Sequence, residues 1–152
     1  MNYYYYEVVV VVVVVDYYQE VDQKEQAGKA IEVALNKNWS NELIKRYGEL
    51  DFGTPHRQLT IAESWIQGRP GNASLLVTLG RLAMRNELWG KAREYFDTSI
   101  EVAPQAEAHG ELARLLKCLG EEQLADEHQA KFVQGIGGEL PSLPMPKDLG
   151  NA

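Results

Sequence analysis

Apolar residues recur along the chain after residue 40 at the three- and four-residue spacing of helices that bury one face. Turn residues separate four such stripes, which consist of Leu43, Tyr47 and Leu50; Leu59, Ala62 and Ile66; Leu75, Leu79 and Leu82; and Leu112, Leu115, Leu116 and Leu119. Thr54 and Pro55 precede the second stripe and are typical N-cap and first-turn residues. The pattern predicts an all-α fold. Short connections, such as residues 68–72, should make neighbouring helices antiparallel.

Small and large residues in the second half of the chain return after 33 positions. Leu79 corresponds to Leu112, Gly80 to Ala113, and Ala92 to Ala125. The tetratricopeptide repeat has a period of about 34 residues and the pattern W-x2-L-G-x2-Y…A-x3-F…P. The stretch that follows residue 72 matches this pattern at Leu79, Gly80, Ala92, Phe96 and Pro104. The second copy is degenerate and has Gln129 in place of the phenylalanine. The offset predicts an α-solenoid of tetratricopeptide-like antiparallel helical hairpins.

The small residues at the repeat positions have a packing role. Gly80 and Ala92 should lie where the two helices of a hairpin cross, because a large side chain there would wedge the helices apart. Pro104 should end the second helix. An earlier copy is visible as Gly28-Lys29-Ala30, which echoes Gly90-Lys91-Ala92. We therefore expect about four hairpins. The alternative is an unrelated helical bundle whose spacing matches by chance.

Both ends of the chain differ from the repeat region, which we assign to residues 21–136. Residues 1–20 contain four consecutive tyrosines and eight consecutive valines without helical periodicity. They are either a β-prone tract or an inserted or undetermined segment. We expect residues 3–18 to be helical or poorly ordered, because a solenoid needs a first helix to cover residues 25–37.

Residues 137–152 form a tail rich in Gly and Pro, which cannot continue a helix. We expect this tail to be extended. It either lies on the last hairpin through Leu140 and Leu143 or serves as a polyproline-type ligand for another molecule.

Composition and charge argue against several classes of function. The net charge of −7 is opposite to the basic footprint of a nucleic-acid-binding protein. Cys118 is the only cysteine, so neither an intrachain disulfide nor a Cys-pair metal site is expected. The apolar run 8–15 is shorter than the ~20 residues that cross a bilayer. The sequence contains no Gly-rich phosphate loop, nucleophile elbow or H-x-x-x-H pair. We predict a non-enzymatic protein with no cofactor or metal.

A set of basic residues is the candidate binding site. In the tetratricopeptide fold the first helix of each hairpin lines a concave groove, and the repeat register places there Arg81, Arg85, Arg114 and Lys117. A looser register adds Lys45 to the same face. Guanidinium groups pair well with carboxylates, so an acidic peptide or a chain terminus is the expected ligand. The alternative is a set of solvated charges paired with Glu87, Glu107 or Glu111. Under the groove hypothesis, reversing Arg81 and Arg114 should weaken partner binding without unfolding the protein.

The histidines are candidate ligands of a metal or haem. His56 should be a surface residue in the first turn of its helix. His109 and His128 lie on the two helices of the last hairpin and could face each other. No further His or Cys is spaced to complete a site. Trp65 and Trp89 fit core or helix-junction positions better than ligand platforms.

Several strings resemble the C-terminal region of the HemY family, over roughly residues 22–146. They are residues 79–82 (LGRL), 88–93 (LWGKAR), 111–116 (ELARLL) and 46–50 (RYGEL), with Trp39 and the Leu-Pro-rich tail. HemY proteins are bacterial inner-membrane proteins associated with protohaem biogenesis. They carry two N-terminal membrane helices that have no counterpart here. The resemblance implies a soluble domain on the cytoplasmic face, attached to the membrane only through a segment absent from this chain.

These patterns predict a scaffold for protein–protein interaction, which binds a partner peptide or enzyme in its concave groove. A role in haem biosynthesis is implied only by the resemblance to HemY. The alternative is a carrier of haem or porphyrin, in which Arg81, Arg85 and Arg114 hold the propionates and His109 is the ligand. Nucleic acid is not an expected partner.

Overall fold

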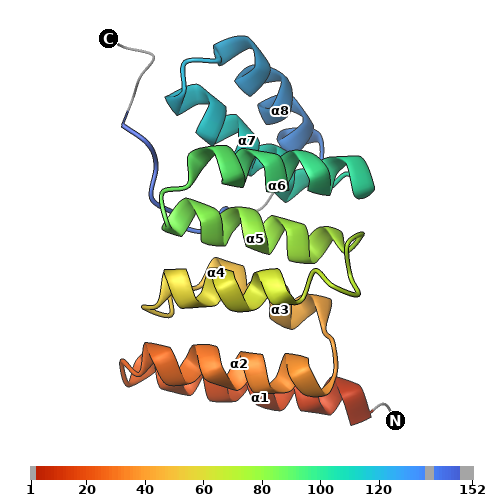
Figure 1. Cartoon of the computed structure of the whole chain (residues 1–152), viewed down its shortest axis with the longest axis vertical. Helices are drawn as coiled ribbons and strands as arrows, with labels where there is room; N and C mark the ends of the chain where they lie inside the picture. Colours follow the sequence, from red (N-terminus) through yellow and green to blue (C-terminus); the bar gives the residue numbers. More distant parts are fainter. Residues whose placement is uncertain (1–2, 136–138, 148–152) are drawn as a thin grey trace.

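The computed structural model describes residues 3–135 and 139–147, and eight α-helices account for most of them. The helices are α1 (Tyr3–Glu20), α2 (Lys24–Lys37), α3 (Asn41–Glu49), α4 (Pro55–Ser64), α5 (Ala73–Arg85), α6 (Trp89–Val102), α7 (Ala106–Cys118) and α8 (Glu122–Gln134). They stack in chain order, from α1 and α2 at one end to α7 and α8 at the other (Figure 1). The pairs α1–α2, α5–α6 and α7–α8 pack closely, whereas α3 and α4 both pack against α5. No strand occurs within the described ranges. The fold is an α-solenoid of helical hairpins, as the repeat pattern predicted.

Helix α1 consists of the Tyr/Val tract, although valine favours strands. Val8 and Val15 are two helical turns apart on one face, and both are buried in the core that α1 shares with α2. Val10 and Val13 lie on the opposite side and remain exposed. The expectation of helix over residues 3–18 is met because burial against a second helix outweighs the strand preference of single valines. None of the helices in the described part combines the length and apolar character needed to cross a bilayer.

Helix α5 lies at the centre of the stack and is buried on every side. All residues from 73 to 84 are buried. Leu75 and Leu79 belong to the core of the N-terminal half, whereas Val77 and Met84 belong to the core of the C-terminal half. The two halves of the solenoid therefore share one helix.

The crossing of α5 and α6 has the geometry that the repeat register predicts. A Cβ on Gly80 would lie 2.3 Å from Cε1 of Phe96, so only glycine fits at this approach. Ala92 and Phe96 are fully buried. The remaining apolar repeat positions are buried as well: Leu79, Leu112, Ala113 and Ala125. Helix α6 ends at Val102, shortly before Pro104.

The last hairpin places its glycine–aromatic contact one turn away from the expected position. A Cβ on Gly110 would lie 2.7 Å from Cδ2 of Phe132. The repeat offset pointed instead to Ala113 and Gln129. In an antiparallel hairpin, one turn back on the first helix and one turn forward on the second leaves the register unchanged. The missing aromatic of the second copy is therefore replaced by Phe132.

Two of the helix starts are capped by side chains that the sequence patterns did not single out. The Ser40 hydroxyl accepts a hydrogen bond from the Leu43 amide at 3.2 Å, and Asn72 Oδ1 accepts one from the Leu75 amide at 2.9 Å. Thr54 occupies the N-cap position of α4, as expected, but its side chain makes no capping hydrogen bond.

Candidate partner-binding face

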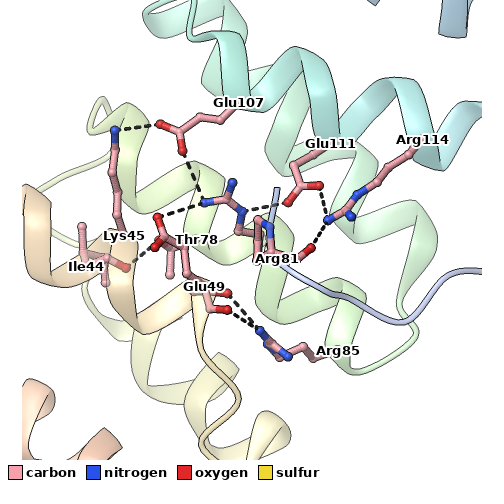
Figure 2. A network of polar contacts seen from close by, with 11 residues as sticks. Ile44, Lys45, Glu49, Thr78, Arg81, Arg85, Glu107, Glu111 and Arg114 are labelled. Carbon is pink, nitrogen blue, oxygen red and sulfur yellow. Dashed lines mark hydrogen bonds and ion pairs between the residues drawn. The ribbon is translucent and has the colours of Figure 1, made fainter. Parts of the chain in front are cut away.

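Charged side chains from three helices converge on one face of the solenoid, which we call the inner face (Figure 2). Residues four apart on a helix lie on the same side, so each helix presents a short charged stripe. Helix α3 contributes two of these residues, α5 two and α7 three. The inner-face network consists of Lys45, Glu49, Arg81, Arg85, Glu107, Glu111 and Arg114.

Arg81 is the centre of the inner-face network and is only 1% exposed. Its Nε donates to Glu111 Oε2 at 2.8 Å, and its Nη1 lies 3.4 Å from Glu107 Oε2 and 4.0 Å from Glu49 Oε1. Glu111 is also 1% exposed, so both partners of the shortest pair are withdrawn from water. A buried charge is tolerated only when it is paired in this way. Arg81 therefore holds α5 to α7 and is not available to a ligand.

The neighbouring cations have partners as well. Lys45 Nζ lies 2.7 Å from Glu107 Oε1. Arg85 donates from Nη2 to the carbonyl of Glu49 at 3.0 Å and to that of Gly48 at 3.4 Å, which closes the C-terminal end of α3. Burial lowers the pKa of the Arg85 guanidinium.

Arg114 connects the inner face to the tail. Its Nη2 lies 2.5 Å from Glu111 Oε1 (Figure 2). The same atom donates to the carbonyl oxygen of Pro141 at 2.8 Å. Two residues further along, Leu143 is buried in the core of the C-terminal half. Residues 139–147, the described part of the tail, are extended and contact the body of the protein through Leu143, which was one of the two expectations for the tail.

The predicted cationic stripe is only partly reproduced. Four of its five residues meet on the inner face, but the three glutamates named above lie among them, so both signs of charge are present. Lys117 is exposed and forms no ion pair with any described residue. The expectation that Arg81 could be reversed without loss of stability is wrong, because a carboxylate there would be buried beside Glu111 and Glu107. The alternative of solvated pairs also fails for Arg81, and Glu87 takes no part in the network.

A hollow of about 650 Å³ opens between the inner face and the tail. The solenoid side is lined by Glu49, Arg81 and Glu107, and the opposite side by tail residues 139–142. A hollow of this volume is large enough for side chains of a bound segment.

His109 and His128 face each other across the last hairpin, as their positions allowed. Their Nδ1 atoms are 2.8 Å apart, so one ring donates a hydrogen bond and the other accepts it. Burial lowers the pKa of both imidazoles. No group of three possible metal ligands occurs among the described residues. His109 turns toward α8, whereas Arg81, Arg85 and Arg114 meet on the inner face, so the residues drawn together for a porphyrin are not brought together.

Sequence reasoning missed a second buried network, which ties α2, α3 and α4 together. Glu32 is 7% exposed, accepts from the Tyr47 hydroxyl at 2.6 Å, and receives two hydrogen bonds from Arg57 at 2.7 and 2.9 Å. Burial, followed by the hydrogen bond to Glu32, raises the pKa of Tyr47. Glu32 and Tyr47 are buried between packed helices, whereas the Arg57 side chain is 40% exposed, and we assign the network to the architecture because it joins three helices.

Comparison with known proteins gives a likeness of fold. No family model matches the chain, and no curated protein matches it. A solved structure titled "MamA RS-1 ArsTM double mutant" is similar, with a TM-score of 0.60 and 17% sequence identity. The match covers 77% of this chain and 68% of that chain. Membership of the HemY family is not supported by any match. At this identity the likeness shows the fold alone, and that fold is a tetratricopeptide-like α-solenoid.

Proposed function

We propose that this protein is a non-enzymatic interaction scaffold that binds a segment of a partner protein on its inner face. The observation that carries the proposal is the hollow beside the inner-face network, which is lined by charged side chains from α3, α5 and α7. Helical hairpin arrays create extended concave surfaces of this kind and use them for binding. The likeness to a tetratricopeptide-like structure supports the same class of function.

The partner segment is proposed to carry acidic groups. Lys45 and Lys117 are the cations of the predicted stripe that are most open to water, since Arg81 is buried and Arg85 donates its hydrogen bonds to the C-terminal end of α3. A carboxylate of the partner could replace Glu107 on Lys45. The glutamates on the same face would repel a strongly acidic segment, so we propose one with isolated carboxylates.

A role beside haem-pathway enzymes at a bacterial inner membrane rests on the resemblance to HemY alone. A haem carrier is not favoured, because the buried Arg81 and the paired His109 are both engaged within the chain.

Lys117 lies one turn beyond Arg114 on the same side of α7, so charge reversal of Lys45 and Lys117 tests the proposed binding face and its edge. The double variant Lys45→Glu/Lys117→Glu should weaken capture of partners roughly two- to thirtyfold, if each lost pair contributes about 0.2–1 kcal/mol. Affinity purification from a bacterial lysate at two salt concentrations, quantified for each captured protein, provides the measurement. Wild-type capture should fall as the salt concentration rises.

The matched control is Lys29→Glu/Lys37→Glu, which changes the net charge equally on exposed positions of α2. This control should retain the wild-type partners. If the Lys45/Lys117 variant keeps the same partners with the same salt dependence, binding does not use the inner face.

A further inference from the structure

The two buried residues in the described part of the tail, Leu143 and Pro146, are three positions apart. Leu140, Pro141 and Met145 are half-buried, whereas Ser142, Pro144 and Lys147 are exposed. A polyproline II helix has three residues per turn and therefore turns every third side chain to the same side. The prolines at positions 141, 144 and 146 fix φ close to the value of that conformation. The tail thus presents one apolar edge to the solenoid.

The contacts of the tail are those of a bound peptide. Proline lacks an N–H group, so the backbone of a Pro-rich segment offers mainly carbonyl acceptors. Arg114 supplies a donor to one of them, the carbonyl of Pro141, at 2.8 Å. Leu143 inserts into the core of the C-terminal half and is 8% exposed. One polar clamp and one apolar anchor, two residues apart, therefore fix the segment.

Arg114, which holds the tail, has unused hydrogen-bonding capacity. Arg114 Nε is buried and finds no hydrogen-bond acceptor among the described residues. Buried donors are usually satisfied, so this atom is suited to a further carbonyl. The hollow beside residues 139–142 also leaves space next to the tail. The tail thus engages the inner face without using all of its contacts.

We propose that residues 139–147 are a built-in ligand of the inner face, and that the partner segment displaces them. This inference deepens the proposed function and rests on it. It specifies the partner as an extended, proline-containing segment with two apolar residues three positions apart. A tethered ligand has an effective concentration of the order of millimolar, so its own affinity can be weak and a partner of micromolar affinity still competes. The tail thus raises the concentration of partner that is needed for binding.

The test uses the full chain and a fluorescent peptide with the sequence of residues 139–147 (ELPSLPMPK). Leu143→Asp in the protein should release the tail, because an aspartate cannot occupy the apolar anchor site. Fluorescence anisotropy should then show the peptide binding about tenfold more tightly to the Leu143→Asp protein than to wild type, as expected if the tail occupies the site about nine-tenths of the time. A peptide that carries the same substitution should not bind.

The matched control is Val133→Asp, which places the same change on an exposed position of α8. This protein should bind the peptide as weakly as wild type does. Equal peptide binding by wild type and a folded Leu143→Asp protein would overturn the inference, as would the absence of saturable binding to the latter. If both Leu143→Asp and the independent variant Pro146→Asp unfold the chain, the tail is part of the core and the inference also fails.

The proposed function is tested separately. Failure of the tail peptide to bind, together with partner capture that still depends on Lys45 and Lys117, overturns only the built-in ligand. Loss of both signals overturns the proposed function as well.

Discussion

Gly80 is a residue at which one methyl group decides the packing of two helices. Its missing Cβ would lie 2.3 Å from the ring of Phe96, and that ring is fully buried and cannot move aside easily. We expect Gly80→Ala to lower the free energy of unfolding by about 1–3 kcal/mol through overpacking. Urea unfolding followed by circular dichroism measures the change.

The control for Gly80 is the same substitution at Gly90, which also lies in a helix. A Cβ there meets no neighbouring atom within 4 Å. Because alanine favours the helix more than glycine does, Gly90→Ala should leave stability unchanged or slightly raise it. Similar losses at the two positions would show that α5 and α6 do not cross at Gly80.

At the residue scale, the repeat pattern predicted contacts between residues whose types match the pattern. Gly80 and Phe96 match the tetratricopeptide pattern, and they meet as the register requires. The contact between Gly110 and Phe132 escaped prediction because the aromatic residue had moved one turn, and a fixed offset does not register such a paired shift. Caps such as Ser40 were also missed, since their role depends on where the helix begins.

The pairing of α7 with α8 should depend on pH through His109 and His128. Both imidazoles have a lowered pKa, so the folded state binds fewer protons than the unfolded chain just below the usual histidine pKa of about 6.5. The stability that they contribute is therefore complete above that pH and is lost as the pH falls toward the folded-state values. The charged groups that act on the pair are Arg93, Asp97, Glu127 and Lys131.

Unfolding by urea at pH 7.5 and pH 5.5 provides the measurement for the histidine pair. Wild type should be less stable at the lower pH, and His128→Asn should show a smaller loss on acidification. His56→Asn is the control, because His56 is exposed on α4 and should leave the pH dependence as it is in wild type. An equal loss on acidification in the His128→Asn and wild-type proteins would contradict a role for the pair.

At the scale of elements, helix α1 was predicted because the array needs a first helix, and not from the residues of the segment itself. The Tyr/Val tract has no helical periodicity, and valine prefers strands, so local rules point away from a helix. Packing against the apolar face of a neighbouring helix determines that α1 is helical. In α5 to α8, by contrast, the helices that form agree with the local signals, which are apolar periodicity, turn residues and the position of Pro104.

The inner-face network connects separate hairpins, and its central charge should therefore matter to the whole molecule. Arg81→Met leaves the buried Glu111 with Arg114 as its remaining partner, and we expect a loss of about 3 kcal/mol in unfolding free energy. Arg81→Met/Glu111→Leu should recover much of that loss, because no unpaired buried charge remains. Thermal or urea unfolding of both variants checks this expectation.

Lys45→Met is the comparison for Arg81→Met, since Lys45 also pairs with Glu107 but keeps 36% of its side chain exposed. Its loss should stay below about 1 kcal/mol. Equal losses for Lys45→Met and Arg81→Met would mean that the Arg81 pair contributes no more than a surface ion pair.

The sequence predicted which cations lie at the candidate site, but not which of them are buried or paired with carboxylates. The repeat register brought Lys45, Arg81, Arg85 and Arg114 to one face. Their acidic partners lie mostly on other helices, so pairing and burial depend on how α3, α5 and α7 converge, which a one-dimensional pattern does not contain. The tail contact of Arg114 depends likewise on where residues 139–147 lie against the solenoid.

The burial of α5 on all sides has a consequence for how the chain unfolds. Repeat arrays can in principle unravel from either end, because each unit contacts only its neighbours. Here side chains of one helix, α5, belong to the cores of both halves. Unfolding of either half would therefore expose one side of α5 to water. Local unfolding that begins at either end must therefore stop at α5 or become unfolding of the whole chain. The protein should therefore behave as a single cooperative unit whose slowest hydrogen exchange lies in residues 73–84.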